Sequence, residues 1–71
     1  MESKDILAFN LLRFRNENNL SQEELAWKSG LSVKGYAQIE RAKVQSSLKT
    51  LDKLSHGICL SVPVLLTPPS I

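Results

Sequence analysis

Apolar residues along this 71-residue chain recur at the three- and four-residue spacing of helices, not at the alternating spacing of strands. One stripe, in the second half of the chain, comprises Leu48, Leu51, Leu54 and Ile58. Short connecting segments join the periodic stretches, which favours a compact all-α domain. The pattern predicts five helices, at about residues 3–18, 21–29, 32–41, 47–58 and 62–66.

Cap residues set the expected helix boundaries. The sequence Ser21-Gln22-Glu23-Glu24 is a capping box, in which the serine accepts from the Glu24 amide and Glu24 reaches back. Asparagines at 18 and 19 end the first helix, because Asn tolerates the left-handed conformation. The other four helices are predicted to begin at serine caps, namely Ser3, Ser32, Ser47 and Ser61. We expect one domain over residues 1–66 and an extended tail, TPPSI, over residues 67–71.

The charge distribution is uneven, although the net charge is only +2. Residues 28–53 hold six basic and two acidic side chains, whereas residues 54–71 hold no Asp, Glu, Lys or Arg. A basic middle segment favours a polyanionic partner such as nucleic acid. The same charges also fit an ordinary solvated face.

Several classes of function are excluded by what the chain lacks. One histidine, His56, and one cysteine, Cys59, cannot supply the four ligands of a structural zinc site or an internal disulfide. No second acid–base set or Gly-rich phosphate loop accompanies them, so we expect no enzyme and no cofactor or metal. No apolar run approaches the length of a membrane span, and the N-terminus lacks the features of a signal peptide. We therefore expect a cytoplasmic protein without membrane contact.

A recognisable motif runs from Leu20 to Glu40, LSQEELAWKSGLSVKGYAQIE. It combines the capping box with a turn glycine, Gly30, and with Ile39-Glu40 at its end. The stretch resembles the helix-turn-helix of the Cro/C1-type (XRE-like) family of prokaryotic DNA-binding proteins, and the resemblance covers about residues 7–66. Small restriction-modification controller proteins look similar, including an aromatic residue at the position of Trp27. The resemblance implies a lambda-repressor-like domain whose third helix enters the major groove.

The third helix carries the residues expected to read DNA bases. At roughly 100° per residue, one outward arc is shared by Val33, Lys34, Ala37, Gln38 and Arg41. We expect Val33, Lys34 and Gln38 to touch base edges, since amides pair with adenine, lysines reach guanine and apolar atoms meet the thymine methyl. Gly35 falls beside this arc, where the third helix is expected to cross the second. It either allows a backbone or a phosphate to approach closely there or has no special role.

Other residues are expected at the DNA backbone. The family counterparts of Ser21 and Gln22 bind phosphate at a helix start, where amides and the helix dipole favour anions. Each lysine in the set, taken singly, also fits a plain surface role. The full set of predicted backbone contacts is Ser21, Gln22, Ser32, Arg41, Lys43 and Lys49.

One charged pair matches the family pattern and three residues depart from it, and all of them bear on the fold. Arg15 and Glu40 match a family pair that forms a salt bridge between the first helix and the end of the third. Tyr36 stands where an aliphatic core residue is usual, so its hydroxyl needs a partner. Ala42 and Cys59 stand where glycine is common, which puts the geometry of two helix ends in question.

The apolar C-terminal segment is richer than one short helix can bury, and dimers in the family commonly form there. The predicted dimer interface is Ile58, Leu60, Val62, Val64 and Leu65. We therefore expect a sequence-specific transcriptional regulator, a dimer on a palindromic double-stranded DNA operator, such as a restriction-modification controller or phage-type repressor. RNA polymerase is a candidate further partner. The alternative is an antitoxin or protein-interaction module that uses the same fold to bind a partner protein.

Overall fold

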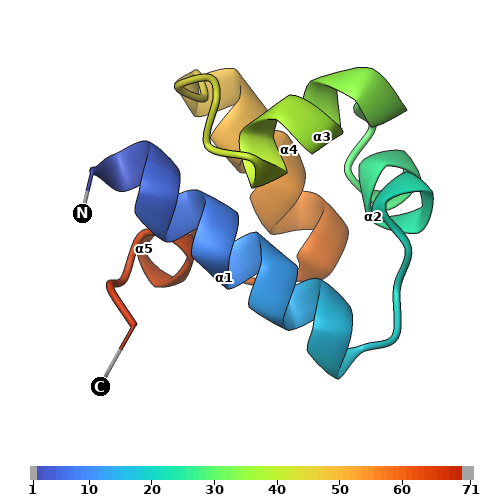
Figure 1. The fold of residues 1–71 in the computed structure, drawn as a ribbon, viewed down its shortest axis with the longest axis horizontal. Helices are drawn as coiled ribbons and strands as arrows, with labels where there is room; N and C mark the ends of the chain where they lie inside the picture. Colours follow the sequence, from blue (N-terminus) through green and yellow to red (C-terminus); the bar gives the residue numbers. More distant parts are fainter. Residues whose placement is uncertain (1, 70–71) are drawn as a thin grey trace.

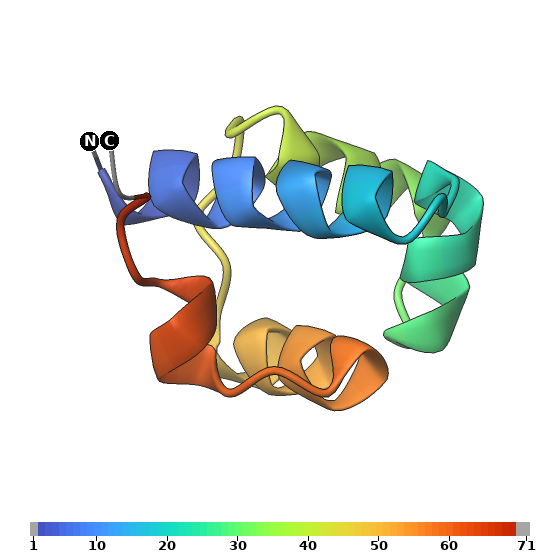
Figure 2. The same cartoon turned by 90° about the horizontal axis from the view of Figure 1, so that it is seen from below.

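The computed structural model describes residues 2–69, and within them it contains five helices and no strand. The predicted all-α fold is therefore confirmed. The last two residues of the predicted tail lie outside the described part. Figures 1 and 2 show α1 and α4 in two layers, with α2 at one end and α5 at the other. The helices are α1 (Ser3–Glu17), α2 (Gln22–Lys28), α3 (Val33–Glu40), α4 (Leu48–Ile58) and α5 (Val62–Leu65).

Hydrogen-bonding caps begin the helices, in four cases as predicted. The Ser21 hydroxyl accepts from the Glu24 backbone N–H at 3.1 Å, and the Glu24 carboxylate accepts from the Ser21 N–H at 2.9 Å. The first helix differs, because its cap is Glu2 and not Ser3, and the Glu2 N–H donates to Asp5 at 3.3 Å. Each of the serine hydroxyl caps on the other four helices stabilises its helix by about 1 kcal/mol. The remaining caps, on α3, α4 and α5, are Ser32, Ser47 and Ser61.

The core fills the space between the two layers. Leu48, predicted to share the α4 stripe, is 78% exposed, because it is the first residue of α4 and lies beyond the core's edge. Two residues predicted for the dimer surface, Ile58 and Leu65, lie in the core at 6% and 1% exposure, so they are unavailable to a partner in this fold. The core comprises Leu7, Leu11, Leu25, Ala26, Tyr36, Ile39, Leu51, Leu54, Ile58 and Leu65.

Hydrogen bonds from a buried asparagine, Asn10, hold the C-terminal segment against α1. The Asn10 side-chain amide donates to the backbone oxygen of Leu65 at 2.7 Å and to that of Thr67 at 3.0 Å. The Thr67 hydroxyl donates in turn to the Pro63 oxygen at 2.7 Å. Thr67, predicted to begin the free tail, is therefore held to the folded unit by hydrogen bonds.

The helix ends at Ala42 and Cys59 keep the geometry that glycine usually supplies. Both residues adopt left-handed backbone angles, with φ of 57° and 58°. Asn19 does the same after α1, with φ of 54°, as predicted for that asparagine pair. A non-glycine residue in this conformation costs roughly 1 kcal/mol, so the departures from the family pattern lower stability and leave the fold unchanged.

The close approach between helices occurs at Gly57 and not at Gly35. A Cβ atom on Gly57 would lie 2.6 Å from the backbone oxygen of Lys28, so α4 packs directly on the end of α2. A Cβ atom on Gly35 would meet only the hydroxyl of its own cap, Ser32, at 2.9 Å. The predicted close approach of α2 to Gly35 is wrong, because no atom of α2 lies within 4 Å of that position.

Replacing Gly57 by alanine is expected to destabilise the fold by about 1–3 kcal/mol, since the added methyl group meets backbone that must shift. Chemical denaturation, analysed with one m-value for all variants, measures the loss of unfolding free energy. Gly35→Ala is the control, because its methyl meets no backbone: it displaces the Ser32 cap hydroxyl, and the gain in helix propensity offsets part of that loss. Equal stabilities of the two variants would contradict the assignment of Gly57 as the packing glycine.

Candidate nucleic-acid interface

A tight turn holds α3 against α2. Gly30 takes a left-handed conformation with φ of 67°, and the Leu31 N–H donates back to the Ala26 oxygen at 2.9 Å. Tyr36 and Ile39 on the inner face of α3 are buried in the core together with Ala26. The opposite face of α3 is thereby turned outward.

The outward face of α3 presents polar side chains to solvent. Lys34 and Arg41 are exposed, and Gln38 is half-buried. Val33 is also half-buried and packs against the core, so less of it is available than the helical arc predicted. The assignment of Val33, Lys34 and Gln38 as base readers stays a prediction, with Lys34 the most accessible of the three.

Segments distant in sequence line an open cleft beside α3. Gln38 lines it, with Ser32 at the start of α3 and with Ser47 and Thr50 in the first turn of α4. The cleft therefore joins the outward face of α3 to the beginning of α4.

The predicted backbone-contacting residues lie around this face. Lys43 is exposed in the loop after α3, and Lys49 is exposed in the first turn of α4. Within residues 2–69 the ion pairs are Arg15–Glu40 and Lys4–Glu2. None of the basic side chains in residues 28–53 is neutralised by such a pair. The remaining exposed members of the predicted set are Ser21, Ser32 and Arg41.

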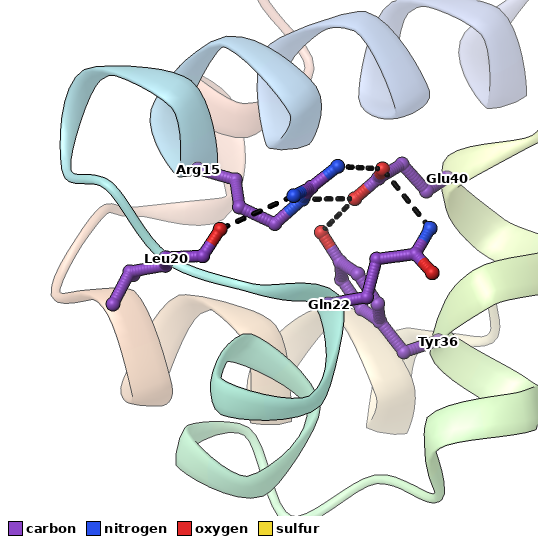
Figure 3. Close-up of polar contacts among 5 residues, drawn as sticks. All are labelled: Arg15, Leu20, Gln22, Tyr36 and Glu40. Carbon is purple, nitrogen blue, oxygen red and sulfur yellow. Dashed lines mark hydrogen bonds and ion pairs between the residues drawn. The ribbon is translucent and has the colours of Figure 1, made fainter.

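The Glu40 carboxylate is the centre of a polar network that joins three helices (Figure 3). Arg15 of α1 donates to it twice, from Nη2 at 2.7 Å and from Nε at 3.0 Å. The Tyr36 hydroxyl donates to it at 2.6 Å, and the Gln22 amide of α2 donates at 3.2 Å. The predicted Arg15–Glu40 pair is therefore present, and its Glu40 side chain is only 6% exposed.

Two partners in this network were missed by sequence reasoning. Tyr36 lies four residues before Glu40, and that spacing on one helix face brings the two side chains together. Its hydroxyl is thus satisfied within the core. Gln22 carries no such local signal, because it approaches Glu40 only once α2 and α3 have packed.

The network also orders the start of α2. Arg15 donates from Nη1 to the Leu20 backbone oxygen at 3.1 Å, which fixes the segment that leads into that helix. The Gln22 amide nitrogen points toward Glu40, and its carbonyl points away (Figure 3). The start of α2 is therefore held in place, but the outward Gln22 oxygen is an acceptor, so the predicted phosphate contact at Gln22 requires an N–H of that residue.

Hydrogen bonding sets the protonation states of this network. Burial alone raises the pKa of Glu40, but hydrogen bonds from Arg15, Tyr36 and Gln22 together bring it below the ordinary value of 4.5. Burial raises the pKa of Tyr36, and its hydrogen bond to Glu40 raises it further. At neutral pH the carboxylate is therefore ionised, and the phenol keeps the proton that it donates.

Neither a cluster of metal-ligating side chains nor a membrane-spanning helix is present in the described residues. Within residues 2–69, no group of three or more His, Cys, Asp or Glu side chains is placed to hold a metal ion. None of the helices in the same range has the length and apolar content to span a bilayer.

A short helix held across a second one by a glycine turn, with its outward face polar and unpaired, defines a DNA-binding helix-turn-helix protein. Residues 11–58 match the helix-turn-helix family. The chain belongs to this family, in its XRE-type branch, and is a DNA-binding transcription regulator.

Similarity to individual proteins supports this assignment. The chain is 46% identical over 67 residues to control protein C.SmaI of Serratia marcescens, across 94% of this chain and 80% of that protein. The crystal structure of the hypothetical transcription factor NHTF from Neisseria superposes with a TM-score of 0.88 at 31% identity, covering 96% of this chain and 78% of that one. The wild-type restriction-modification controller protein C.Esp1396I gives a TM-score of 0.79 at 28% identity, covering 92% and 83%. The predicted family and fold are confirmed.

The Glu40 network is expected to make stability depend on pH. Because the folded pKa of Glu40 is lowered, its contribution is fully present above pH 4.5 and is lost as the pH falls through the folded pKa. Glu40→Gln should lower the free energy of unfolding at neutral pH by roughly 3 kcal/mol, since Arg15 loses its charged partner. Thermal melts of the wild type and of Glu40→Gln across a pH series should show the difference between their melting temperatures narrowing as the pH falls.

The control for this series is Glu17→Gln, which alters an exposed carboxylate of α1. Its melting temperature should follow that of the wild type throughout. A wild-type advantage over Glu40→Gln that grows toward low pH would show that folding raises the pKa of Glu40 instead of lowering it.

Proposed function

We propose that the protein binds a specific palindromic operator in double-stranded DNA as a homodimer and regulates transcription by occupying it. The observation that carries the proposal is the outward face of α3, where exposed Lys34 and half-buried Gln38 lie beside basic side chains that form no ion pair within residues 2–69. In this assignment α3 lies in the major groove. Ser21 and Gln22 at the start of α2, with Lys43 and Lys49, hold the phosphate backbone.

We also propose that the regulated system is a restriction-modification system in the cytoplasm. Two similar proteins, C.SmaI and C.Esp1396I, carry the description of control or controller protein. The likeness to C.SmaI extends over nearly the whole chain, which supports a shared role more strongly than a match to the helix-turn-helix alone.

The homodimer is proposed to form through the outer surface of α5 and the segment before it. Val64 is 50% exposed, whereas Leu60 and Val62 are half-buried and offer part of their surface. Two-fold symmetry through this end of the molecule would set two recognition helices about 34 Å apart, one turn of DNA.

Selection of bound duplexes from a random pool is expected to yield a two-fold symmetric sequence. Lys34→Ala and Gln38→Ala should each lose about 1–3 kcal/mol of binding free energy on that sequence and relax preference at one position per half-site. Lys49→Ala should weaken all sequences alike and reduce the slope of log K against log salt by about 0.9 per contact. Fluorescence anisotropy at several salt concentrations measures the binding free energy and its salt dependence. Absence of any preferred sequence would refute the proposal.

Placing a charge at the proposed dimer surface is expected to separate the protomers. Val64→Asp should shift the protein to a monomer, because the new carboxylate would be buried without a partner. Sedimentation equilibrium at micromolar concentration measures the change. Pro63→Ala, at an exposed neighbouring position, serves as the control and should remain dimeric. A monomeric wild type would exclude the dimer.

A further inference from the structure

A second open cleft lies between the end of α2 and α4, lined by residues other than those of the cleft that contains Gln38. Its walls come from the end of α2 with the turn after it, and from the outer face of α4. The side chains that line it carry mostly positive charge. Those used in the argument are Lys28, Lys49, Asp52, Lys53 and His56.

Positive charge is concentrated in this cleft. Lys49 and Lys53 lie four residues apart on α4, so their side chains share one face and are about 6 Å apart along the helix axis. Lys28 faces them from the last turn of α2. All three are exposed, and none lies within 4.0 Å of a carboxylate in residues 2–69. Asp52 lines the cleft beside them, and Glu24 interacts electrostatically with Lys28, but three lysines still leave the cleft with an excess of positive charge that attracts a polyanion.

The packing at Gly57 creates this arrangement. Because Gly57 has no side chain, the Lys28 backbone lies directly against α4, and the lysines of two separate helices line one cleft. Gly30 lines the same cleft and likewise offers no side chain that would obstruct a ligand.

Residues adjacent in sequence line the basic cleft and the cleft that contains Gln38. Gly30 lines the basic cleft, and the next two residues, Leu31 and Ser32, line the cleft that contains Gln38. Lys49 and its neighbour Thr50 are divided between the two clefts in the same way. The two clefts therefore adjoin each other at the α2–α3 turn and at the first turn of α4.

We infer that Lys28 and Lys53 bind the sugar–phosphate backbone of DNA flanking the sequence read by α3, so that the bound protein covers more DNA than it reads. The inference rests on the proposed function, in which α3 faces DNA. It assigns the outer face of α4 and the end of α2 a role in affinity without sequence preference, since phosphate contacts carry no base information.

The test compares two duplexes, one limited to the sequence recovered by selection and one with about 10 base pairs of arbitrary sequence, one helical turn, added at each end. The wild type should bind the longer duplex more tightly. Lys28→Ala/Lys53→Ala should lose roughly tenfold in affinity on the longer duplex at low salt, and its salt slope there should fall by about 1.8 per protomer. On the short duplex it should match the wild type.

Two controls accompany the double variant. Lys4→Ala removes a lysine at the start of α1 whose ammonium lies 3.6 Å from Glu2, and it should leave both duplexes unaffected. Thermal melts should show the double variant as stable as the wild type, because Lys28 and Lys53 are exposed.

Equal binding of the double variant and the wild type to the longer duplex would overturn the inference, as would an equal loss on both duplexes. Retained DNA binding with loss of an acidic protein partner would assign the cleft to that protein instead. A wild type that prefers no sequence but needs both lysines on long duplexes would overturn the proposed function alone.

Discussion

The buried Glu40 carboxylate is the constraint on which the arrangement of the first three helices depends. A carboxylate removed from water costs several kcal/mol unless charge and hydrogen bonds offset that cost. Here the offset comes from Arg15 on α1, Gln22 on α2 and Tyr36 on α3. A shift of any of these helices would leave the charge partly unpaired, so the position of α3 is fixed by electrostatics as well as by apolar packing.

The features predictable from sequence are those with local signals. Serine caps, the capping box and the helical stripes depend on residues a few positions apart, and they located the helices to within one or two residues. Contacts that form only after packing left no such signal. The amide of Asn10 meets backbone oxygens more than fifty positions away, and Gln22 meets Glu40 across eighteen. Apolar content likewise could not separate Leu65, which is buried, from Val64, which is exposed one position earlier.

The two glycines in helices illustrate the same limit. An angular count placed Gly35 at a helix crossing, but the count describes one helix and says nothing about where its neighbours lie. The contact that requires a glycine is at Gly57, where α4 meets the Lys28 backbone. That approach depends on how α2 and α4 are oriented by the core between them, which no single helix encodes.

Stability and the proposed DNA contacts depend on the same interactions within the fold. The network at Glu40 orders Gln22 at the start of α2, and the contact at Gly57 brings the far end of α2 to the lysines of α4. Both ends of one seven-residue helix are thus fixed by residues distant in sequence. A helix this short has little stability alone. It can present polar groups at its start and a basic side chain at its end in defined positions because α1, α3 and α4 hold it, which lowers the ordering cost of binding an extended polyanion.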